Sequence, residues 1–247
     1  MNDLKGKRAL VTGGSRGIGA SIAVALAEKG ADVAITYHQS PDRAADVVRK
    51  IEAMGRRGLA IRADSADPAA VRRSVNEAVD TLGGLDILVN NVGTARMGKF
   101  VDLSLEDLDA ILDTNVRATV IATQAAIPHF MSGGRIITIG SNAAERSPFP
   151  GLAAYALSKS AMLGLTRHLA RELGPQGITV NLVQPGPTDT DMNPANGGEL
   201  ADLNRRLSAL NRYASPAEIA AATVFLASPA ASYMTGSVVT VDGGWNA

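Results

Sequence analysis

The chain has 247 residues, and its 24 lysines and arginines balance 24 aspartates and glutamates, so the formal net charge is zero and a nucleic-acid partner is disfavoured. It contains no cysteine, which excludes disulfides, thiolate metal sites and cysteine nucleophiles, and its three histidines are scattered without metal-ligand spacing. No apolar run reaches membrane-spanning length, so we expect a cytoplasmic protein that binds neither a membrane nor a metal.

A glycine-rich turn follows the first predicted strand, over residues 8–12, which starts so near the N-terminus that we expect no signal peptide. Residues 12–19 read Thr-Gly-Gly-Ser-Arg-Gly-Ile-Gly and run into a helix predicted over 17–29. Glycines let the backbone approach a pyrophosphate closely, and a helix N-terminus offers amide donors and a positive dipole. The Gly-x-x-x-Gly-x-Gly spacing in this context predicts a dinucleotide site; the alternative is an ordinary glycine-rich turn.

The end of the second predicted strand, over 32–37, favours NADP(H) over NAD. An acidic residue there would hold the 2′-hydroxyl of NAD, but residues 35–40 contain no carboxylate. Arg16, inside the glycine loop, could bind the 2′-phosphate, with His38 and Ser40 as neutral donors. The alternatives are that Arg16 is merely solvated and that His38 is an ordinary loop residue.

The rest of the chain alternates short apolar runs with longer amphipathic ones. Further strands are predicted at 59–63, 86–90, 135–140, 178–183 and 237–241, and helices at 41–54, 68–82, 104–130, 153–173 and 216–227. This order predicts an α/β fold with a parallel sheet covered by helices on both faces. We expect one domain over residues 1–247, with a substrate lid at about 187–213, where Pro, Asn, Gly and Asp are frequent.

Tyr155 and Lys159 belong to the helix predicted over 153–173. They are four residues apart and therefore share one helix face, about one turn from each other. A lysine cation beside a phenol stabilises the phenolate and lowers the tyrosine pKa from its usual value of about 10. Such a tyrosine can pass a proton to or from a substrate oxygen. Taken alone, the pair could equally be a half-buried tyrosine packed on a lysine stem.

In their order along essentially the whole chain, these motifs resemble those of the short-chain dehydrogenase/reductase family. Residues 90–93, Asn-Asn-Val-Gly, are similar to the family's Asn-Asn-Ala-Gly motif, with Val92 in place of alanine, and Asp64 matches the position that contacts adenine. The resemblance implies a Rossmann-type, doubly wound, seven-stranded parallel sheet with helices on both faces. It also implies NADP(H) contacts from Gly13, Ser15, Arg16, Gly17, Ile18, Gly19, His38, Ser40, Asp64, Ser65, Asn91, Gly93, Tyr155, Lys159, Pro185, Gly186, Thr188 and Thr190.

Four residues match the family's catalytic positions: Ser141, Tyr155, Lys159 and Asn115. The resemblance implies reversible hydride transfer between NADP(H) and a ketone or secondary alcohol. Ser141 would hold the carbonyl oxygen and Tyr155 would exchange the proton. Lys159 would lower the Tyr155 pKa and bind the nicotinamide ribose, and Asn115 would help hold a water that relays protons to Lys159. The loop over 142–154 borders the substrate, and its length leaves its shape open.

Within the family the chain is similar to bacterial 3-oxoacyl-acyl-carrier-protein reductases and to related small-ketone reductases. Two positions associated with docking of the acidic carrier protein align with Ser132 and Gln176, neither of them basic, although Arg146, Arg167 and Arg171 could substitute. We therefore expect a small or medium ketone or alcohol as substrate, with carrier-protein thioester reduction as the alternative.

Two further expectations concern the lid and the assembly. Met192 and Leu200 are candidates for an apolar wall against the substrate, or for ordinary lid packing. The resemblance implies a homotetramer built from the helices that carry Asn115 and Tyr155. A function of another class, a non-catalytic NADP-binding regulator, is the remaining alternative.

Overall fold

The computed structural model describes residues 3–247 and contains one sheet of seven strands. Every neighbouring pair of strands is parallel. The predicted doubly wound, seven-stranded parallel sheet is confirmed. In spatial order the strands are β3 (Gly58–Arg62), β2 (Asp32–Tyr37), β1 (Arg8–Val11), β4 (Leu85–Asn90), β5 (Phe130–Ile139), β6 (Thr179–Pro185) and β7 (Val238–Val241).

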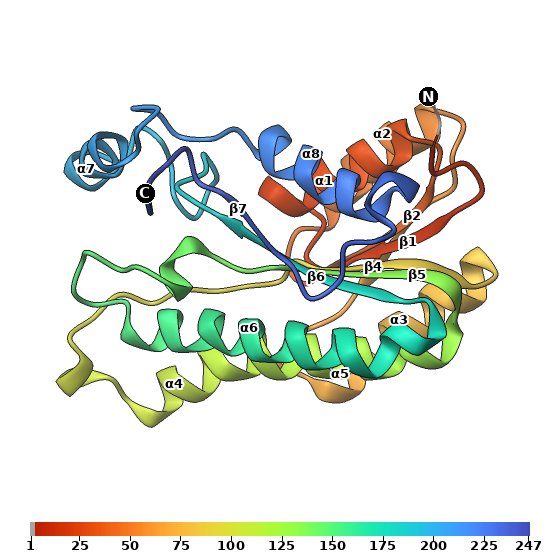
Figure 1. Ribbon diagram of the computed structural model, residues 1–247, viewed down its shortest axis with the longest axis horizontal. Helices are drawn as coiled ribbons and strands as arrows, with labels where there is room; N and C mark the ends of the chain where they lie inside the picture. Colours follow the sequence, from red (N-terminus) through yellow and green to blue (C-terminus); the bar gives the residue numbers. More distant parts are fainter. Residues whose placement is uncertain (1–2) are drawn as a thin grey trace.

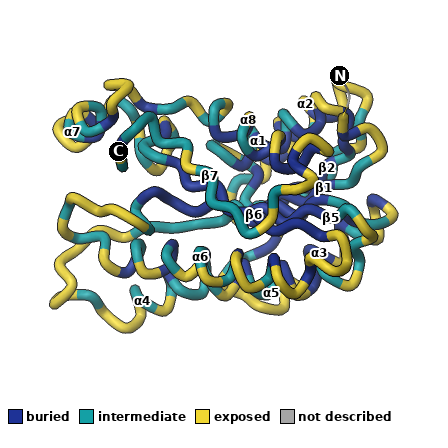
Figure 2. Tube along the Cα trace, in the orientation of Figure 1, coloured by how far each residue is buried: buried dark blue, intermediate teal, exposed yellow. Residues whose placement is uncertain are grey.

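Helices cover both faces of the sheet (Figure 1). Aliphatic side chains fill both layers: Ile22, Leu26 and Ile35 are completely buried on one face, and Leu10 and Leu88 on the other. Figure 2 shows the buried strands in the middle of the molecule. Strands buried on both faces read as continuous apolar runs, which is why the sequence located them. The first face carries α1 (Gly17–Glu28), α2 (Pro41–Ala53) and α8 (Pro216–Ala227); the second carries α3 (Pro68–Leu82), α4 (Leu105–Leu112), α5 (Ala118–Ala126) and α6 (Ala153–Leu173).

The strand order reverses between β1 and β4. From β1 the chain first builds β2 and β3 on one side, and then returns to β4 and continues to β7 on the other. In open parallel sheets, ligands bind at the carboxyl ends of the strands where the order reverses. The glycine loop follows β1 and residues 91–93 follow β4, so the fold brings both predicted cofactor motifs to this point.

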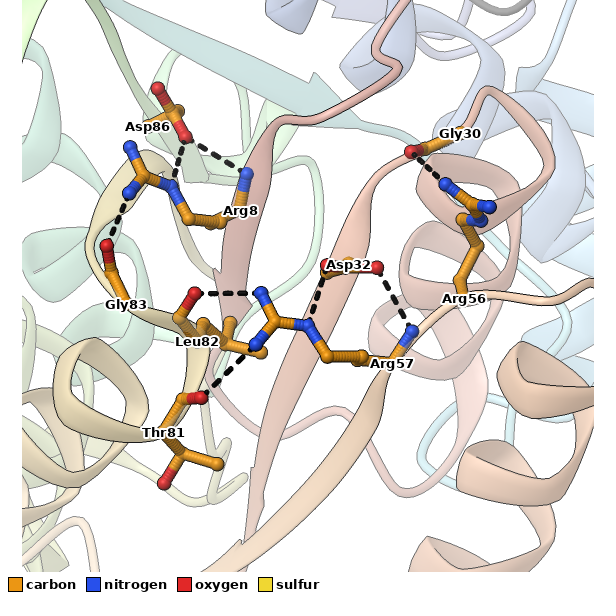
Figure 3. A network of polar contacts seen from close by, with 9 residues as sticks. All are labelled: Arg8, Gly30, Asp32, Arg56, Arg57, Thr81, Leu82, Gly83 and Asp86. Atoms are coloured by element: carbon orange, nitrogen blue, oxygen red, sulfur yellow. Dashed lines mark hydrogen bonds and ion pairs between the residues drawn. The ribbon is translucent and has the colours of Figure 1, made fainter.

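At the opposite edge, where the strands begin, two aspartates tie neighbouring strands together (Figure 3). Asp86 accepts hydrogen bonds from the backbone N–H and Nε of Arg8, at 2.9 and 2.7 Å. Asp32 accepts bonds from the backbone N–H and Nε of Arg57, at 2.9 and 2.8 Å, and the same guanidinium donates to the Leu82 carbonyl at 2.7 Å. These contacts hold the amino ends of β1–β4 together. They lie at the end of the sheet opposite to the predicted cofactor motifs.

The stretch predicted as one helix over 104–130 is two helices joined by a π-turn. After α4 the π-turn spans Asp113–Arg117, and α5 follows. After a 3-10 turn at Ile127–His129 the chain enters β5 at Phe130, earlier than predicted. A π-turn inserts one residue into a helix and is frequent at functional sites. Here it carries Asn115.

The predicted lid contains a helix, α7 (Glu199–Leu207), which the sequence-based prediction lacks. It lies at one end of the molecule, beside the chain's C-terminus (Figure 1). The base of the lid is bonded internally. The Asp189 N–H donates to the Ala214 carbonyl at 2.9 Å, and the Tyr213 hydroxyl donates to Asn193 Oδ1 at 3.1 Å. The lid is therefore a folded segment, not an irregular loop.

Candidate active site

The glycine loop between β1 and α1 has a backbone that strongly favours glycine. Gly13 and Gly17 have φ angles of 65° and 55°, which glycine adopts without strain. A Cβ at Gly14 would lie 2.6 Å from the side chain behind it on β2, and a Cβ at Gly19 would lie 2.4 Å from Asn91 Nδ2. The loop thus packs against β2 and against the turn after β4 with no room for side chains.

The helix that follows this loop offers free amide groups at its start. Helix α1 begins at Gly17 without a side-chain cap. The N–H groups of Gly17, Ile18 and Gly19 are the first three of the helix and have no intrahelical acceptor. Together with the helix dipole they suit an anion such as a pyrophosphate. Ser15 and Arg16 directly precede them.

Asn91 fixes the shape of the glycine loop. Its Nδ2 donates to the carbonyls of Thr12 and Gly13, at 3.0 and 3.1 Å. The Thr12 hydroxyl in turn accepts the N–H groups of Asn91 and Val92, at 3.0 and 3.3 Å. Cγ2 of Val92 would lie 2.9 Å from a Cβ at Gly13, so the valine packs directly on the loop.

Charged side chains gather where the 2′-phosphate of the cofactor is expected. Arg16 Nη1 lies 3.5 Å from Asp191 Oδ2, and Arg43 of α2 pairs with the same carboxylate. His38 Nε2 lies 3.7 Å from Asp64 Oδ2. All these side chains are substantially exposed, so each can exchange its partner for another anion or donor at little cost.

Asp64 and Ser65 follow β3 at the same edge of the sheet. Asp64 Oδ1 accepts the N–H of Ala66 at 2.9 Å and so closes its own turn. Ser65 lines a small hollow together with Val92. This position beside the glycine loop is compatible with the adenine contact that the resemblance implies.

Tyr155 and Lys159 lie in the first turns of α6, one turn apart as predicted. Lys159 is buried, with 5% of its surface exposed, whereas Tyr155 is partly exposed. Nζ of Lys159 lies 5.8 Å from the centre of the Tyr155 ring. It donates a hydrogen bond to the Ile139 carbonyl at 3.0 Å. The lysine is thus anchored to the end of β5, next to the residues that lead to Ser141.

The pKa values of the pair differ from the sequence-based expectation. Burial raises the pKa of Tyr155 above its usual 10.0, and hydrogen bonding with Ser141 lowers it by a smaller amount. Burial lowers the pKa of Lys159 from 10.5 to about 8, because the ammonium loses hydration. The net pKa of Tyr155 is therefore raised, because burial outweighs the Ser141 bond, and the lowering by Lys159 stays a prediction. The ammonium is directed to the Ile139 carbonyl, and burial disfavours the charged form of both groups.

Asn115 ties the π-turn to the start of α6. Its Oδ1 accepts the Thr94 N–H at 2.7 Å, and its Nδ2 donates to the Thr94 carbonyl and to Ser158 Oγ, both at 2.9 Å. Ser158 Oγ then donates to the Tyr155 carbonyl at 2.7 Å. The asparagine side chain thus bonds to both neighbouring segments and makes no bond to the lysine.

Gly93 keeps a space open between Lys159 and Asn115. A Cβ at Gly93 would lie 3.3 Å from Lys159 Nζ and 3.6 Å from Asn115 Oδ1. The two side chains therefore border one space that a residue other than glycine would narrow. The water relay between them stays a prediction.

Ser141 leads from β5 into a 3-10 turn, Asn142–Ala144. Its hydroxyl accepts the Ala143 N–H at 3.2 Å, which leaves the hydroxyl proton available to another acceptor. Ser160 of α6 donates to the Ala144 carbonyl at 2.9 Å. This bond holds the serine turn against the helix that carries Tyr155.

The segment after β6 closes over the glycine loop. Pro185 ends the strand, and the Gly186 N–H donates to the last residue of β7 at 3.0 Å. Thr188 Oγ1 donates to the Gly186 carbonyl at 3.0 Å. A Cβ at Gly17 would lie 3.3 Å from Thr190 Cγ2, so Thr190 lies against the loop. The structure thus brings this segment, the glycine loop and the turn after β4 together.

Sequence reasoning missed the residues that support the site from behind. Thr94, Ser158 and Ser160 make the bonds described above, and Arg43 joins Arg16 at the acidic partner. Ser158 could have been predicted, since it is a small polar residue next to Lys159 on α6. Thr94, Ser160 and Arg43 could not, because their bonding partners are distant in sequence.

Residues 3–247 offer neither a cluster of metal ligands nor a membrane-spanning helix. Within residues 3–247, no three histidine, aspartate or glutamate side chains cluster so as to hold a metal ion. In the same range no helix combines the length and the apolarity that crossing a bilayer requires.

Known proteins similar to this chain include reductases and dehydrogenases. A family model described as enoyl-(acyl carrier protein) reductase matches residues 13–246. A cyclic-di-GMP-binding biofilm dispersal mediator protein of Escherichia coli is 43% identical over 247 residues, with 100% of each chain covered. A 3-oxoacyl-acyl-carrier-protein reductase of Staphylococcus aureus is 40% identical over 240 residues, covering 96% of this chain and 97% of its own. The crystal structure of a short chain dehydrogenase from Burkholderia cenocepacia in complex with NADP superposes with a TM-score of 0.97; it is 55% identical and covers 99% of this chain and 100% of its own.

Proposed function

Because the chain belongs to the short-chain dehydrogenase/reductase family, we propose that this oxidoreductase uses NADPH to reduce a ketone to a secondary alcohol. The observation that supports the proposal most directly is the meeting of Ser141, Tyr155 and Lys159, from the turn after β5 and the start of α6, next to Gly93 after β4. The uncapped start of α1 and the space over Gly93 suit the cofactor. A 55% identical structure was crystallised with NADP, which supports the choice of cofactor.

Each side chain then has one task. NADPH, once bound, would supply the hydride that the carbonyl carbon receives. Ser141 donates a hydrogen bond to the carbonyl oxygen and holds it toward Tyr155, which gives its proton to that oxygen as negative charge develops there. Lys159 stabilises the phenolate that remains and binds the nicotinamide ribose. Asn115 holds the turn after β4 against α6, and a water between it and Lys159 returns the proton.

The shifted pKa values favour reduction at neutral pH. Tyr155, with its pKa raised by burial, is protonated there, which is the state that a general acid needs. Lys159 has a pKa of about 8 and is charged below that pH. Alcohol oxidation needs the phenolate before reaction, so we expect it to require a higher pH than reduction.

The proposal is tested by NADPH oxidation with three carbonyl probes: ethyl acetoacetate, cyclohexanone and the N-acetylcysteamine thioester of acetoacetate. Turnover of any probe at a rate proportional to protein concentration supports the proposal. NADPH binding without turnover of any of them contradicts it.

We favour a small or medium ketone over a carrier-protein thioester. Ser132 and Gln176 are uncharged where an acidic carrier protein would dock. Arg146, one possible substitute, donates to the Trp245 carbonyl at 3.0 Å and is engaged within the protein. In the lid, Met192 and Leu200 are 61% and 39% exposed and offer an apolar wall. The Staphylococcus aureus relative supports the thioester alternative, and faster turnover of the thioester probe than of both ketones would favour it.

A non-catalytic regulator is the candidate of a different class. It is supported by the 43% identical Escherichia coli protein, which is named for cyclic-di-GMP binding and biofilm dispersal. The buried Lys159 argues against it. Burial lowers the pKa of this lysine to about 8, which means that the buried ammonium lowers the free energy of unfolding. A protein that catalyses no reaction has no use for a charge that destabilises its fold.

Arg16→Gln is expected to weaken NADPH binding by about 10- to 100-fold and to leave NADH binding nearly unchanged. A charge-assisted hydrogen bond contributes about 1.5–3 kcal/mol, and only NADPH carries the 2′-phosphate that would receive it. Dissociation constants for both cofactors, from the quenching of protein fluorescence, measure the difference.

Arg49→Gln is the matched control for that experiment, since Arg49 is an exposed arginine that pairs with Asp46 on its own helix α2. It should change neither the NADPH affinity nor the NADH affinity. An Arg16 variant with equal losses for the two cofactors would contradict the assignment of Arg16 to the phosphate.

We propose that the protein is a cytoplasmic homotetramer. Large apolar side chains are exposed around α4 and α6: Phe100 is 73% exposed, Val101 86%, Leu105 77% and Leu157 54%. Exposed apolar patches of this kind mark protein interfaces. Light scattering is expected to give four times the 25.5 kDa chain mass, and the mass of a single chain would contradict the proposal.

A further inference from the structure

The C-terminal segment 242–246 lies between two parts of the site that are distant in sequence, the turn after Ser141 and the end of the lid. The C-terminus lies beside the lid helix α7 (Figure 1). We propose that this segment, named here the C-terminal clasp, positions Ser141 and the lid relative to each other. This role rests on the proposed reductase function.

One end of the clasp bonds to the residue next to Ser141. Asn246 Nδ2 donates to the Asn142 carbonyl at 3.2 Å, and Asn142 Nδ2 donates to Asn246 Oδ1 at 3.4 Å. The same Asn142 carbonyl accepts the N–H groups of Glu145 and Arg146, both at 3.1 Å. This carbonyl thus organises the turn, and moving Asn246 would move the Asn142–Ala143 peptide, whose N–H group donates to the Ser141 hydroxyl.

The middle of the clasp holds the loop that borders the substrate. Trp245 is 4% exposed, and the Phe149 ring meets it edge to face at 5.9 Å. The Arg146 guanidinium lies 5.9 Å from the centre of the Trp245 ring and donates to the Trp245 carbonyl at 3.0 Å. The loop over 142–154, whose shape the sequence left open, thus contacts this tryptophan through Arg146 and Phe149.

The start of the clasp bonds to the end of the lid. The Gly243 carbonyl accepts Ser208 Oγ and the Leu210 N–H, both at 3.0 Å, directly after α7. A Cβ at Gly243 would lie 2.7 Å from Ser208 Oγ, and a Cβ at Gly244 would lie 2.8 Å from the Ala209 Cβ. Both glycines have positive φ, 64° and 77°. The lid therefore packs on backbone that has no space for a side chain.

The clasp is bonded internally and also touches the segment after β6. The Asp242 carboxylate accepts the N–H groups of Gly244 and Asn246, at 2.9 and 3.0 Å, which sets the turn. A Cβ at Gly186 would lie 2.7 Å from the Asp242 Cα. A turn that is bonded internally and also bonded to both the serine loop and the lid would transmit a displacement of one to the other. It acts through Ser141 and the lid, so its residues are positioning residues.

Two substitutions separate the two ends of the clasp. With ethyl acetoacetate as probe, Asn246→Ala is expected to lower kcat about tenfold with an NADPH dissociation constant within twofold of wild type, because small misplacements at the reacting atoms cost up to about a hundredfold. Gly244→Ala is expected to raise KM by about tenfold with a smaller loss of kcat, because it moves the lid. Asn246→Asp keeps one of the two amide bonds and should lie between. Ala247→Ser, at the exposed neighbouring residue, is the control and should match wild type.

Fluorescence gives a reading that does not depend on turnover, because Trp245 is the only tryptophan in the chain. Acrylamide quenching of Trp245 is expected to rise in Asn246→Ala and to stay unchanged in Ala247→Ser. Unchanged quenching in Asn246→Ala, or increased quenching with kcat and KM both within twofold of wild type, overturns the proposal.

Failure of the proposed function is distinguishable from failure of the clasp. Wild-type protein that turns over none of the three probes contradicts the reductase proposal, and the quenching comparison still decides whether Asn246 holds the clasp. If Asn246→Ala does not fold, Arg146→Ala and its conservative partner Arg146→Lys replace it. A loss of kcat and increased quenching in the first, both restored in the second, support the proposal, and equal values in the two overturn it.

Discussion

Replacement of Tyr155 by phenylalanine is expected to lower the kcat of ketone reduction roughly a thousandfold, within the 10²–10⁴-fold that general acid catalysis contributes. The substitution keeps the ring on α6 and removes only the hydroxyl, which burial holds in its protonated form. Neither the glycine loop nor the Lys159–Ile139 bond depends on that hydroxyl. NADPH binding should therefore remain, and single-turnover NADPH oxidation with ethyl acetoacetate measures the chemical step.

Tyr233→Phe is the matched control for this experiment. Tyr233 is fully exposed, so the same loss of a hydroxyl there should leave kcat unchanged. A Tyr155→Phe protein that reduces the ketone at close to the wild-type rate would show that the proton comes from another donor. Circular dichroism and the NADPH dissociation constant separate a loss of chemistry from a loss of folding.

The fold was predictable where a physical signal is local and strong. The strands around Leu10, Ile35 and Leu88 are continuous aliphatic runs because both faces of the sheet are covered. Helix α8 begins at a capping box, Ser215 with Glu218, that can be read from four residues. Such elements need no knowledge of distant contacts.

Elements set by distant contacts were missed. Helix α7 is short and follows two glycines in a segment rich in Pro, Asn, Gly and Asp, so the helical spacing of its leucines, Leu200, Leu203 and Leu207, was overlooked. Its place is fixed through Tyr213 and the clasp. The first residues of β5, Phe130 to Gly134, include two glycines, and their pairing with β4 depends on a partner far away in sequence. The π-turn at Asn115 is a one-residue insertion, which helical periodicity does not register.

The same division applies to the candidate site. The glycine loop and the Tyr155–Lys159 spacing are local patterns, and the structure brings them together at one edge of the sheet. The pKa of Tyr155 is not a local property. Spacing suggested that Lys159 would lower it, but burial acts on both groups and the lysine is held by Ile139. The contribution of an ion to a neighbouring pKa depends on where the ion points and on what surrounds it.

Lys159→Met is expected to abolish efficient reduction and to stabilise the fold. Burial lowers the pKa of Lys159 from 10.5 to about 8, so between these pH values the unfolded chain binds a proton that the folded chain has released. The free energy of unfolding of the wild type therefore rises with pH across this window, and below pH 8 the whole cost of the buried charge, on the order of 3 kcal/mol, is present.

Methionine is similar in length to lysine and uncharged, so the variant should melt at a higher temperature than wild type at pH 7. Its free energy of unfolding should no longer rise between pH 8 and 10.5. The Ile139 carbonyl then loses its donor, which offsets roughly 1–3 kcal/mol of this gain. Reduction should slow by about a hundredfold or more, since nothing remains to stabilise the phenolate.

Lys50→Met, at an exposed position on α2, is the control and should change neither the stability nor the rate of reduction. A Lys159→Met protein that is less stable than wild type at pH 7 would mean that the ammonium is better solvated than its burial implies. If the Lys159→Met variant is more stable than wild type but inactive, the charge of Lys159 serves the reaction and lowers the stability of the fold.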